Sequence, residues 1–354
     1  MTATNSHASP SLMSRLVTAI LGIKPVFNFA KQRARAMMVK RAAAIGVDWP
    51  GEVKALRSRQ PSELGPDQKD VSIHPNWEAE LAALRNDQLV YPDYYVRSFH
   101  AYEEGNLGWR PAMEADVAGK TVHAKIWEGA GAKGDRMLRK SYYDVVKDTI
   151  SIAPRQILDI GSSAGHSTFG LRSLYPMAQC TGVDLSPYFL TVAQYFETIH
   201  NGMPPVSTSG LAVKNLVPVG TPASNSAPAA KPFSPIRWVH AAGESTGLED
   251  ESFDLASICL VMHELPSDAT RKLLAEMRRV LKPGGYVAIM DMNPKADIYL
   301  KMPPYILTLL KSTEPFLDEY FSLDLEQAVW DAGFTRPSVT HNSPRHRTVI
   351  AQAR

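Results

Sequence analysis

Two glycines enclose a short loop after the first clear strand of the sequence. Residues 157–168 read ILDIGSSAGHST: an apolar run that ends in an acid, a Gly-x-x-x-Gly loop, and the start of a helix near His166. Gly161 and Gly165 permit positive φ and close approach of a ligand to the backbone. The helix start offers unpaired N–H groups. This pattern is typical of the nucleotide-binding corner of a doubly wound sheet, but alone it leaves open a dinucleotide, a phosphate, another nucleoside or no ligand.

A second acid, Asp184, ends the next strand in TGVDLSPYFL, 23 residues after Gly161. A carboxylate at this place faces a ribose and can accept hydrogen bonds from both hydroxyls. The alternative is a cap for the following helix, although Ser186 or Pro187 could equally begin that helix. We therefore expect Asp184 to mark the ribose side of a nucleoside site.

The loop does not have the usual dinucleotide pattern. The fingerprint Gly-x-Gly-x-x-Gly is absent, and the sequence reads Gly-Ser-Ser-Ala-Gly instead. With no pyrophosphate to hold, the loop favours a ligand that joins adenosine to a cationic or amino-acid end. Asp159, at the tip of the first strand, could place a carboxylate near that amino group.

His263 is the side chain best suited to proton transfer. It lies in VMHEL, just past the fourth strand, where the carboxyl edge of the sheet faces the ligand. A histidine that titrates near neutrality can act as a general base. The alternative is a histidine that only lines the cleft or caps a turn. The neighbouring Glu264 is a weaker candidate, and we expect it to be structural.

Alternating strands and helices position these residues. From residue 154 onward, short apolar runs recur with helical segments between most of them: RQILDI, AQCTGVD, IRWVHA, FDLASICLVM and YVAIMD. In the clearest helix, DATRKLLAEMRRVLKPGG, Asp268 can cap the start and Pro283-Gly284-Gly285 ends it. This alternation predicts a parallel sheet with right-handed crossovers. The last two runs, FTRPSVTH and HRTVIAQA, predict an antiparallel hairpin on the sheet edge.

The chain divides into three parts by composition. We expect a basic segment at 1–49, a helical and aromatic cap region at 50–149, and a main domain at 150–354. An insertion at 202–235 is rich in Pro, Ser, Ala and Gly, which predicts a surface loop. The cap contains the aromatic-dense stretch YPDYYVRSFHAYEEGNLGW at 91–109.

Charge is unevenly placed along the chain. Residues 1–47 contain seven basic and no acidic residues, which leaves 31 basic against 36 acidic residues for the rest. A segment of this kind is typical of an organelle transit peptide, of a basic amphipathic helix on an anionic membrane, or of a helix docked on the main domain. The net charge of the whole chain is only +2, so nucleic acid is not an expected partner.

The two cysteines, Cys180 and Cys259, lie in apolar, strand-like runs. No Cys/His ligand spacing surrounds them, so we expect buried free thiols, a reducing compartment and no metal site. No apolar run approaches the ~18–20 residues needed to span a bilayer.

Taken together, the motifs resemble those of class I S-adenosylmethionine (SAM)-dependent methyltransferases, of the kind related to the ubiquinone/menaquinone C-methyltransferases. ILDIGSSAG resembles the first motif of this family, VDLSPYFL its ribose-binding second strand, and RVLKPGGYVAIMDMNP its fifth strand. HAAGESTGLEDESFDLASICLVMHEL resembles its third and fourth strands. The resemblance covers residues 150–291 and 334–353. It implies an α/β, Rossmann-like, seven-stranded and mostly parallel sheet with an antiparallel C-terminal hairpin, here with an N-terminal helical extension.

The resemblance also implies contacts with SAM and its product, S-adenosylhomocysteine (SAH). The glycine loop would wrap the methionine part, Asp184 would hold the ribose, and Leu185 would pack on the adenine. The stretch from Leu260 to His263 would line the methyl-transfer site. The residues expected to bind the cofactor are Asp159, Gly161, Ser162, Ser163, Gly165, Asp184, Leu185, Glu244 and Leu260.

Two positions depart from the family pattern. Ser163 replaces the middle glycine of the loop, a change that fits if its φ stays negative. Ala242 stands where relatives often carry an Asp for the adenine amino group, so recognition of adenine falls to backbone groups or to the nearby Glu244.

A small acceptor would be held by parts outside the core, the aromatics of 91–109 and the segment 301–321. Aromatics at such density favour a flat or apolar acceptor, although they could simply pack the extra helices onto the domain. With the basic N-terminus, they suggest a lipophilic acceptor met at a membrane surface. We expect a monomeric or weakly associating enzyme, in the cytoplasm or in an organelle such as a plastid or mitochondrion.

Other readings stay open. A nicotinamide-dependent oxidoreductase is opposed by the missing third glycine and the C-terminal hairpin. A SAM-fold module that has lost catalysis and serves as a binding or assembly factor is favoured by Ala242 and the long additions. C-methylation and O-methylation are not separated by the sequence.

Overall fold

The computed structural model describes residues 24–59, 72–100, 102–199 and 233–354. The predictions about residues 1–23, and about the insertion as far as residue 232, lie outside this part of the chain.

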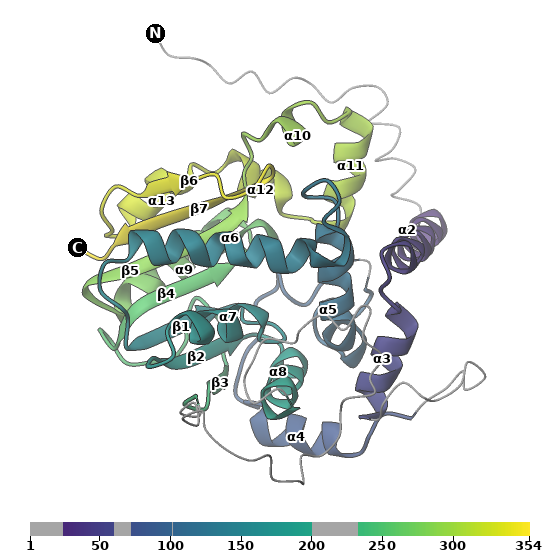
Figure 1. Ribbon diagram of the computed structural model, residues 1–354, viewed down its shortest axis with the longest axis horizontal. Coiled ribbons are helices and arrows are strands. Elements are labelled where there is room, and N and C mark those ends of the chain that lie inside the picture. The colour runs from purple at the N-terminus through teal and green to yellow at the C-terminus, as the bar shows by residue number, and fades with distance from the viewer. Residues whose placement is uncertain (1–23, 60–71, 101, 200–232) are drawn as a thin grey trace, which may run out of the picture.

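A seven-stranded sheet organises the main domain, in the order β3-β2-β1-β4-β5-β7-β6 (Figure 1). The first five strands run parallel, and β7 is antiparallel to both β5 and β6. This order confirms the predicted fold class and the hairpin on the sheet edge. The strands are β1 Gln156–Ile160, β2 Gln179–Asp184, β3 Arg237–His240, β4 Phe253–Cys259, β5 Leu281–Met292, β6 Ser338–Thr340 and β7 His346–Gln352.

Helices cover both faces of the sheet, which is why the central strands read as nearly continuous apolar runs. Ile157 of β1 packs among residues of α6 Gly134–Thr149, α7 His166–Leu174 and α8 Pro187–Ile199. Its neighbour Leu158 faces the other side, among residues of α9 Ser267–Val280, α12 Leu317–Ser322 and α13 Leu325–Asp331. Both free cysteines, Cys180 and Cys259, are buried, as expected.

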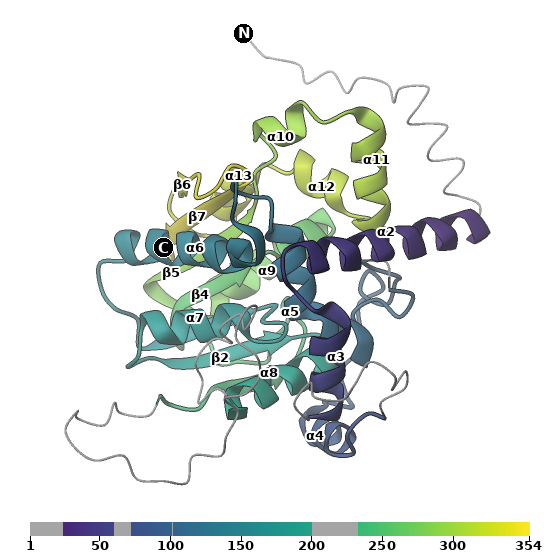
Figure 2. The ribbon, with the colours of Figure 1, turned by 45° about the vertical axis from the view of Figure 1, so that its right-hand side comes forward.

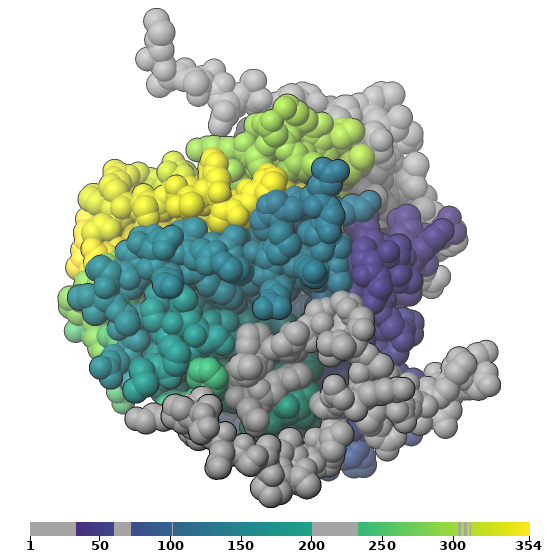
Figure 3. Space-filling view, in the orientation of Figure 1, coloured from purple at the N-terminus to yellow at the C-terminus, as the bar shows by residue number. Residues whose placement is uncertain are grey.

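Helix α6 lies on the sheet although it belongs to the predicted cap region. The hydroxyl of Tyr142, a fully buried residue, lies 2.9 Å from Ser257 Oγ of β4 and donates to the carbonyl of Ala288 in β5 at 3.2 Å. Figure 1 shows this helix crossing in front of the strands. In the space-filling view its surface adjoins that of the C-terminal strands (Figure 3).

Four further helices form the cap: α2 Lys24–Ala44, α3 Trp49–Ser58, α4 Asn76–Leu84 and α5 Trp109–His123. Figure 2 shows α2 standing beside α3 and α5, with α10 Asp297–Leu300 and α11 Pro304–Thr313 above it. Trp77 of α4 is fully buried and packs edge-on against Tyr195 of α8, with ring centroids 4.9 Å apart. Trp109, in the aromatic stretch, packs against Trp77 and Tyr188. This residue therefore joins cap to domain, as the simpler interpretation expected.

The ends of α9 differ from the prediction. The helix begins at Ser267, and the N–H of Ser267 donates to Glu319 Oε2 of α12 at 2.8 Å. Asp268, the expected cap, instead pairs with Lys272 on the surface. The helix ends at Val280, and Pro283-Gly284-Gly285 lies inside β5, because the N–H of Gly284 bonds to Ala353 and draws the segment into the sheet. Among the described helices, none combines the length and apolar character required to cross a bilayer.

Candidate active site

The loop after β1 contains three residues in the left-handed conformation. Gly161 has φ 66°, Ser163 has φ 48°, and Gly165, at the N-cap of α7, has φ 87°. The condition under which a serine fits here, a negative φ, is therefore not met. A side chain costs about 1–2 kcal/mol in this conformation. The backbone is held there because the N–H of Ser163 donates to Asp184 Oδ2 at 2.8 Å.

Packing explains why the outer two positions are glycine. A Cβ on Gly161 would lie 2.6 Å from Val261 Cγ2, and a Cβ on Gly165 would lie 2.8 Å from Phe169 and 3.0 Å from Trp238. These separations are much shorter than van der Waals contact. The loop is thus drawn tightly against α7, β3 and the end of β4, so the two glycines serve close packing within the protein.

Asp184 is a buried carboxylate beside this loop. It is 8% exposed, and its Oδ1 accepts the N–H of Ser186 at 2.8 Å, while Oδ2 is taken by Ser163. Burial raises the pKa of Asp184 to about 6, although both N–H groups favour the charged form. A carboxylate offers about four acceptor sites. The two N–H groups and the Tyr95 hydroxyl take three of them, so one stays open, and a second opens if Tyr95 turns away. Ser186 caps α8, accepting the Phe189 N–H at 3.4 Å.

Asp159 and Ser162 line the inner side of the loop. Asp159 is 1% exposed, and its Oδ2 accepts the hydroxyls of Ser167 and Thr168 at 2.7 Å each. These bonds tie the tip of β1 to the first turn of α7. Ser162 is equally buried, and its Oγ has no hydrogen-bond partner within the described residues. The predicted contact between Asp159 and an amino group stays a prediction.

The aromatic stretch of the cap covers the residues that the resemblance assigns to ribose and adenine. The phenol of Tyr94 donates to Glu244, the residue expected to help recognise adenine. Tyr95 stacks on Tyr91 with ring centroids 6.2 Å apart, and its hydroxyl faces Asp184. The aromatics therefore meet the expected cofactor residues, a placement that the sequence did not indicate.

His240 at the end of β3 holds the cap residue Asn86 against the main domain. Its Nδ1 accepts the N–H of Asn86 at 2.8 Å, so the proton lies on Nε2, which donates to the carbonyl of Leu185 at 3.0 Å. Burial lowers the pKa of His240, consistent with a neutral ring. Leu185 itself is 8% exposed and lies where the resemblance places the adenine.

His263 lies past the end of β4, in η2 Met262–Glu264. Its Nδ1 is 2.7 Å from Asp291 Oδ1 of β5, and its backbone N–H donates to the same carboxylate. Leu260, just before it, has a left-handed φ of 61°, which turns the chain out of the strand. Asp291 is 1% exposed and fixes the His263 ring, so the other ring nitrogen, Nε2, is left for a ligand.

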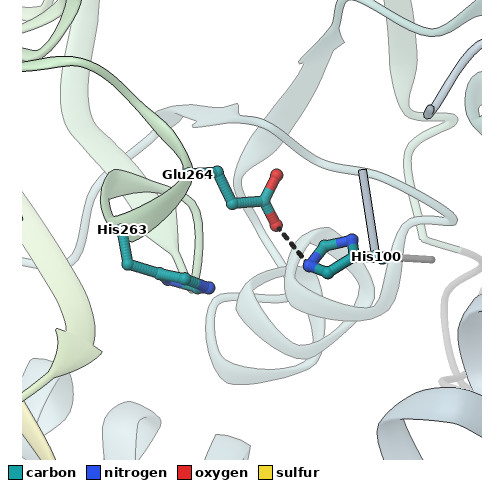
Figure 4. Close-up of side chains that lie close together, drawn as sticks. All are labelled: His100, His263 and Glu264. Carbon is teal, nitrogen blue, oxygen red and sulfur yellow. Dashed lines mark ion pairs between the residues drawn. The ribbon is translucent and has the colours of Figure 1, made fainter. Parts of the chain in front are cut away.

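Two residues distant in sequence, His100 and Glu314, lie beside His263 and Glu264. His100 Nε2 lies 3.5 Å from Glu264 Oε1 and 3.1 Å from Glu314 Oε1, which directly follows α11. His100 occupies a turn closed by hydrogen bonds between Phe99 and Tyr102, with φ 47°. Figure 4 shows the Glu264 carboxylate pointing at His100, with the ring of His263 extending toward the same space.

These side chains shift one another's pKa values. Burial lowers the pKa of His263, but the charge and hydrogen bond of Asp291 outweigh it and raise the pKa to about 10. Burial likewise opposes a charge on His100, yet Glu314 and Glu264 raise its pKa to about 8. Burial raises the pKa of Glu264 to about 7, against the pull of both histidines. In the resting site both histidines are therefore protonated at neutral pH.

Sequence reasoning missed His100, Asp291 and Glu314. His100 lies in the cap and Glu314 beyond the core motifs, so no local spacing connects either residue with His263. Asp291 carried the only signal, since it is an acid near the carboxyl end of a predicted buried strand.

A separate hollow of about 400 Å³ lies on the surface, between α9 and α12. It is lined by residues such as Ser267, Arg271 and Asp318, and none of its lining residues belongs to the glycine loop or the strand ends. We therefore place the candidate site at the strand ends.

One family model matches the part of the chain that follows the glycine loop and Asp184. Residues 215–289 match a family model described as a methyltransferase domain. This match ends within β5 and includes β3, β4 and His263. This part of the chain is similar to a methyltransferase domain, and the strand order is the one expected for the class I SAM-dependent family. No curated protein sequence matches the chain, and the predicted ubiquinone-type subgroup stays a prediction.

Solved methyltransferases resemble the domain at low identity. A SAM-dependent methyltransferase from Aquifex aeolicus is 18% identical, with a TM-score of 0.42, over 66% of this chain and 98% of its own. A possible histamine N-methyltransferase from Thermotoga maritima is 17% identical, with a TM-score of 0.41, over 62% and 90%. Human N-acetylserotonin methyltransferase is 17% identical, with a TM-score of 0.42, over 69% of this chain and 57% of its own. Identities this low say nothing about the substrate.

Proposed function

We propose that the methyltransferase domain binds SAM and transfers its methyl group to a small aromatic or lipophilic acceptor. The observation that carries the proposal is the buried Asp184 carboxylate, held beside the left-handed glycine loop by two backbone N–H groups. The carboxylate keeps acceptor capacity for one ribose hydroxyl, and for both if the Tyr95 hydroxyl turns away when the nucleoside binds. The place and chemistry of this acid suit a nucleoside.

Other residues near the strand ends also suit SAM. The unpartnered Oγ of Ser162 lies on the inner side of the loop, where the methionine part would lie. Acids near the strand ends (Asp159, Asp184 and Asp291) suit a ligand with a sulfonium and an ammonium group. The aromatic cap would cover the adenosine and exclude water.

When bound, SAM supplies an activated methyl group, so catalysis depends chiefly on alignment and exclusion of water. The acceptor atom forms a bond to the methyl carbon as the carbon–sulfur bond breaks and its electron pair passes to sulfur. An acceptor that carries a proton must also release it. His263 faces the place where the acceptor would lie, but Asp291 keeps its ring protonated at neutral pH. A general-base role therefore requires that the ring first lose this proton.

Calorimetric titration of the full chain with SAM, SAH and NADH tests the proposal. We expect micromolar dissociation constants for SAM and SAH at pH 8, and no heat with NADH. Affinity for SAM should fall as the pH drops through about 6, because protonation of Asp184 removes the charged acceptor of the ribose hydroxyls. Binding of NADH without SAM would overturn the proposal.

Turnover is tested next, with methyl-labelled SAM and a panel of phenols and quinones. Label in any acceptor supports an enzyme. SAM binding with no transfer to any member of the panel would favour the alternative of an inactive binding or assembly factor.

We also propose a peripheral membrane contact for the N-terminal region, in the cytoplasm or an organelle. Arg33, Lys40 and Arg41 are exposed on α2, and basic side chains of this kind are attracted to anionic lipid. The full chain should therefore sediment with anionic liposomes at low salt and less so with neutral ones. Equal recovery with both would contradict the contact.

A further inference from the structure

We propose that His100, His263, Glu264 and Glu314 bind a divalent first-row transition metal at the acceptor end of the active site. No metal was expected from the sequence, because these four ligands come from the cap turn, from the end of β4 and from the end of α11. The geometry points to a site with two nitrogen and two oxygen ligands, a set that suits cations such as Zn²⁺ or Mn²⁺.

The spacing of the ligand atoms supports a metal. One ligand atom each from His100, His263 and Glu264 lies within 4.8 Å of the others. Ligands about 2.1 Å from a metal lie roughly 3.4 Å apart in a tetrahedron and up to about 4.2 Å apart in an octahedron. The separations of His100 Nε2 from the two glutamates, 3.5 and 3.1 Å, already match the tetrahedral edge. Since the atoms lie up to 4.8 Å apart, metal binding would shorten the longest separation by up to about 0.6 Å in an octahedron and about 1.4 Å in a tetrahedron.

The partner of His263 is a second observation in favour. Histidines that bind metals almost always donate their other ring N–H to a carboxylate or carbonyl, which fixes the tautomer. Asp291 does this for His263: it is 1% exposed and lies 2.7 Å from Nδ1. The ring is thereby fixed with Nε2 available to a ligand.

Glu314 supplies a third observation. It is 9% exposed, and its Oε2 is buried with no hydrogen-bond partner among the described residues. A buried carboxylate oxygen without a partner is costly, and a cation at the cluster would satisfy it.

The backbone conformation of the turn that carries His100 is one often found at ligand sites. A histidine at φ 47° is strained, and such strain persists where the surrounding structure holds it, often at ligand sites. The bridge between Phe99 and Tyr102 holds the turn, and the Phe99 ring packs edge-on against the imidazole at 4.3 Å.

The role of the metal, unlike its binding, rests on the proposed function. Four protein ligands fill a tetrahedron, so this role requires five- or six-coordination. A remaining position would then bind an oxygen of the acceptor and lower the proton affinity of that oxygen. This narrows the proposed acceptors to molecules with a hydroxyl group at the methylated position or beside it.

Metal binding is tested on the full chain after removal of metals with a chelator. Mn²⁺ titration followed by electron paramagnetic resonance, and Zn²⁺ titration against a chromophoric chelator, give stoichiometry and affinity without an acceptor. We expect one equivalent per chain. His100→Ala and Glu314→Gln should each weaken binding at least tenfold, whereas His341→Ala, at an exposed histidine outside the cluster, should leave it unchanged.

Circular dichroism of each variant separates loss of a ligand from loss of the fold. No binding by the unmodified chain, or equal affinity in all variants, would overturn the metal site. SAM titration of the same samples keeps the two proposals apart. SAM binding without metal binding overturns only the metal site, and metal binding without SAM binding overturns only the proposed function.

Discussion

Replacing Asp184 with alanine is expected to weaken SAM binding by roughly 100- to 20,000-fold. Hydrogen bonds to a charged group contribute about 1.5–3 kcal/mol each, and the substitution removes the acceptor of two ribose hydroxyls. It also frees the N–H groups of Ser163 and Ser186 that organise the loop. Calorimetric titration at pH 8 measures the change.

Two further variants make this result specific. Asp184→Asn keeps one oxygen for the loop but no charge, so its loss of affinity should be smaller than that of the alanine variant and should no longer depend on pH near 6. Asp268→Ala removes an exposed surface carboxylate and should bind SAM as the unmodified chain does. An Asp184→Ala variant that remains folded and binds SAM normally would disprove the ribose contact.

Replacing Gly165 with alanine is expected to lower the free energy of unfolding by about 2–5 kcal/mol and to abolish SAM binding. Alanine at φ 87° costs about 1–2 kcal/mol. Its methyl group would also lie 2.8 Å from the fully buried ring of Phe169, and overpacking of a core costs about 1–3 kcal/mol more. Relief of the clash would displace the loop. Denaturant unfolding and SAM titration measure the two effects.

Gly247 provides a matched control for this substitution. It has φ 68°, yet a Cβ there would meet nothing within 4 Å. Gly247→Ala should therefore cost only about 1 kcal/mol and leave SAM affinity unchanged. The reverse change, Ser163→Gly, should stabilise the chain by relieving the left-handed strain. Equal losses at Gly165 and Gly247 would show that packing against Phe169 does not matter.

Most of the fold could be predicted because its signals are local. Apolar runs such as ILDI and SICL are long enough to form buried strands, and turn residues separate them. The last two runs lie close together in sequence, so their antiparallel pairing followed directly. The ends of α9 were mispredicted because a distant residue, Glu319, caps its start, and because a hydrogen bond to Ala353, near the C-terminus, draws the Pro-Gly-Gly segment into β5.

The site residues likewise fall into those that local sequence signals predicted and those that depend on distant contacts. Gly161, Gly165 and Asp184 lie where sequence reasoning put them, because each follows a strand whose end is fixed by the sheet. The left-handed conformation of Ser163 could not be predicted, since its N–H donates to Asp184, a residue of another strand, and this bond holds the backbone there. The approach of Tyr95 to Asp184 depends on how the cap lies on the sheet.

The sequence alone thus determined the doubly wound sheet, the glycine loop and the acid at the end of β2. Each depends on residues close together in the chain, where periodicity and turn chemistry limit the choices. Only the tertiary structure brought His100 and Glu314 to His263 and Glu264, and placed Asp291 behind the His263 ring. Such contacts join distant segments, and the packing of the cap and α11 against the strand ends decides them.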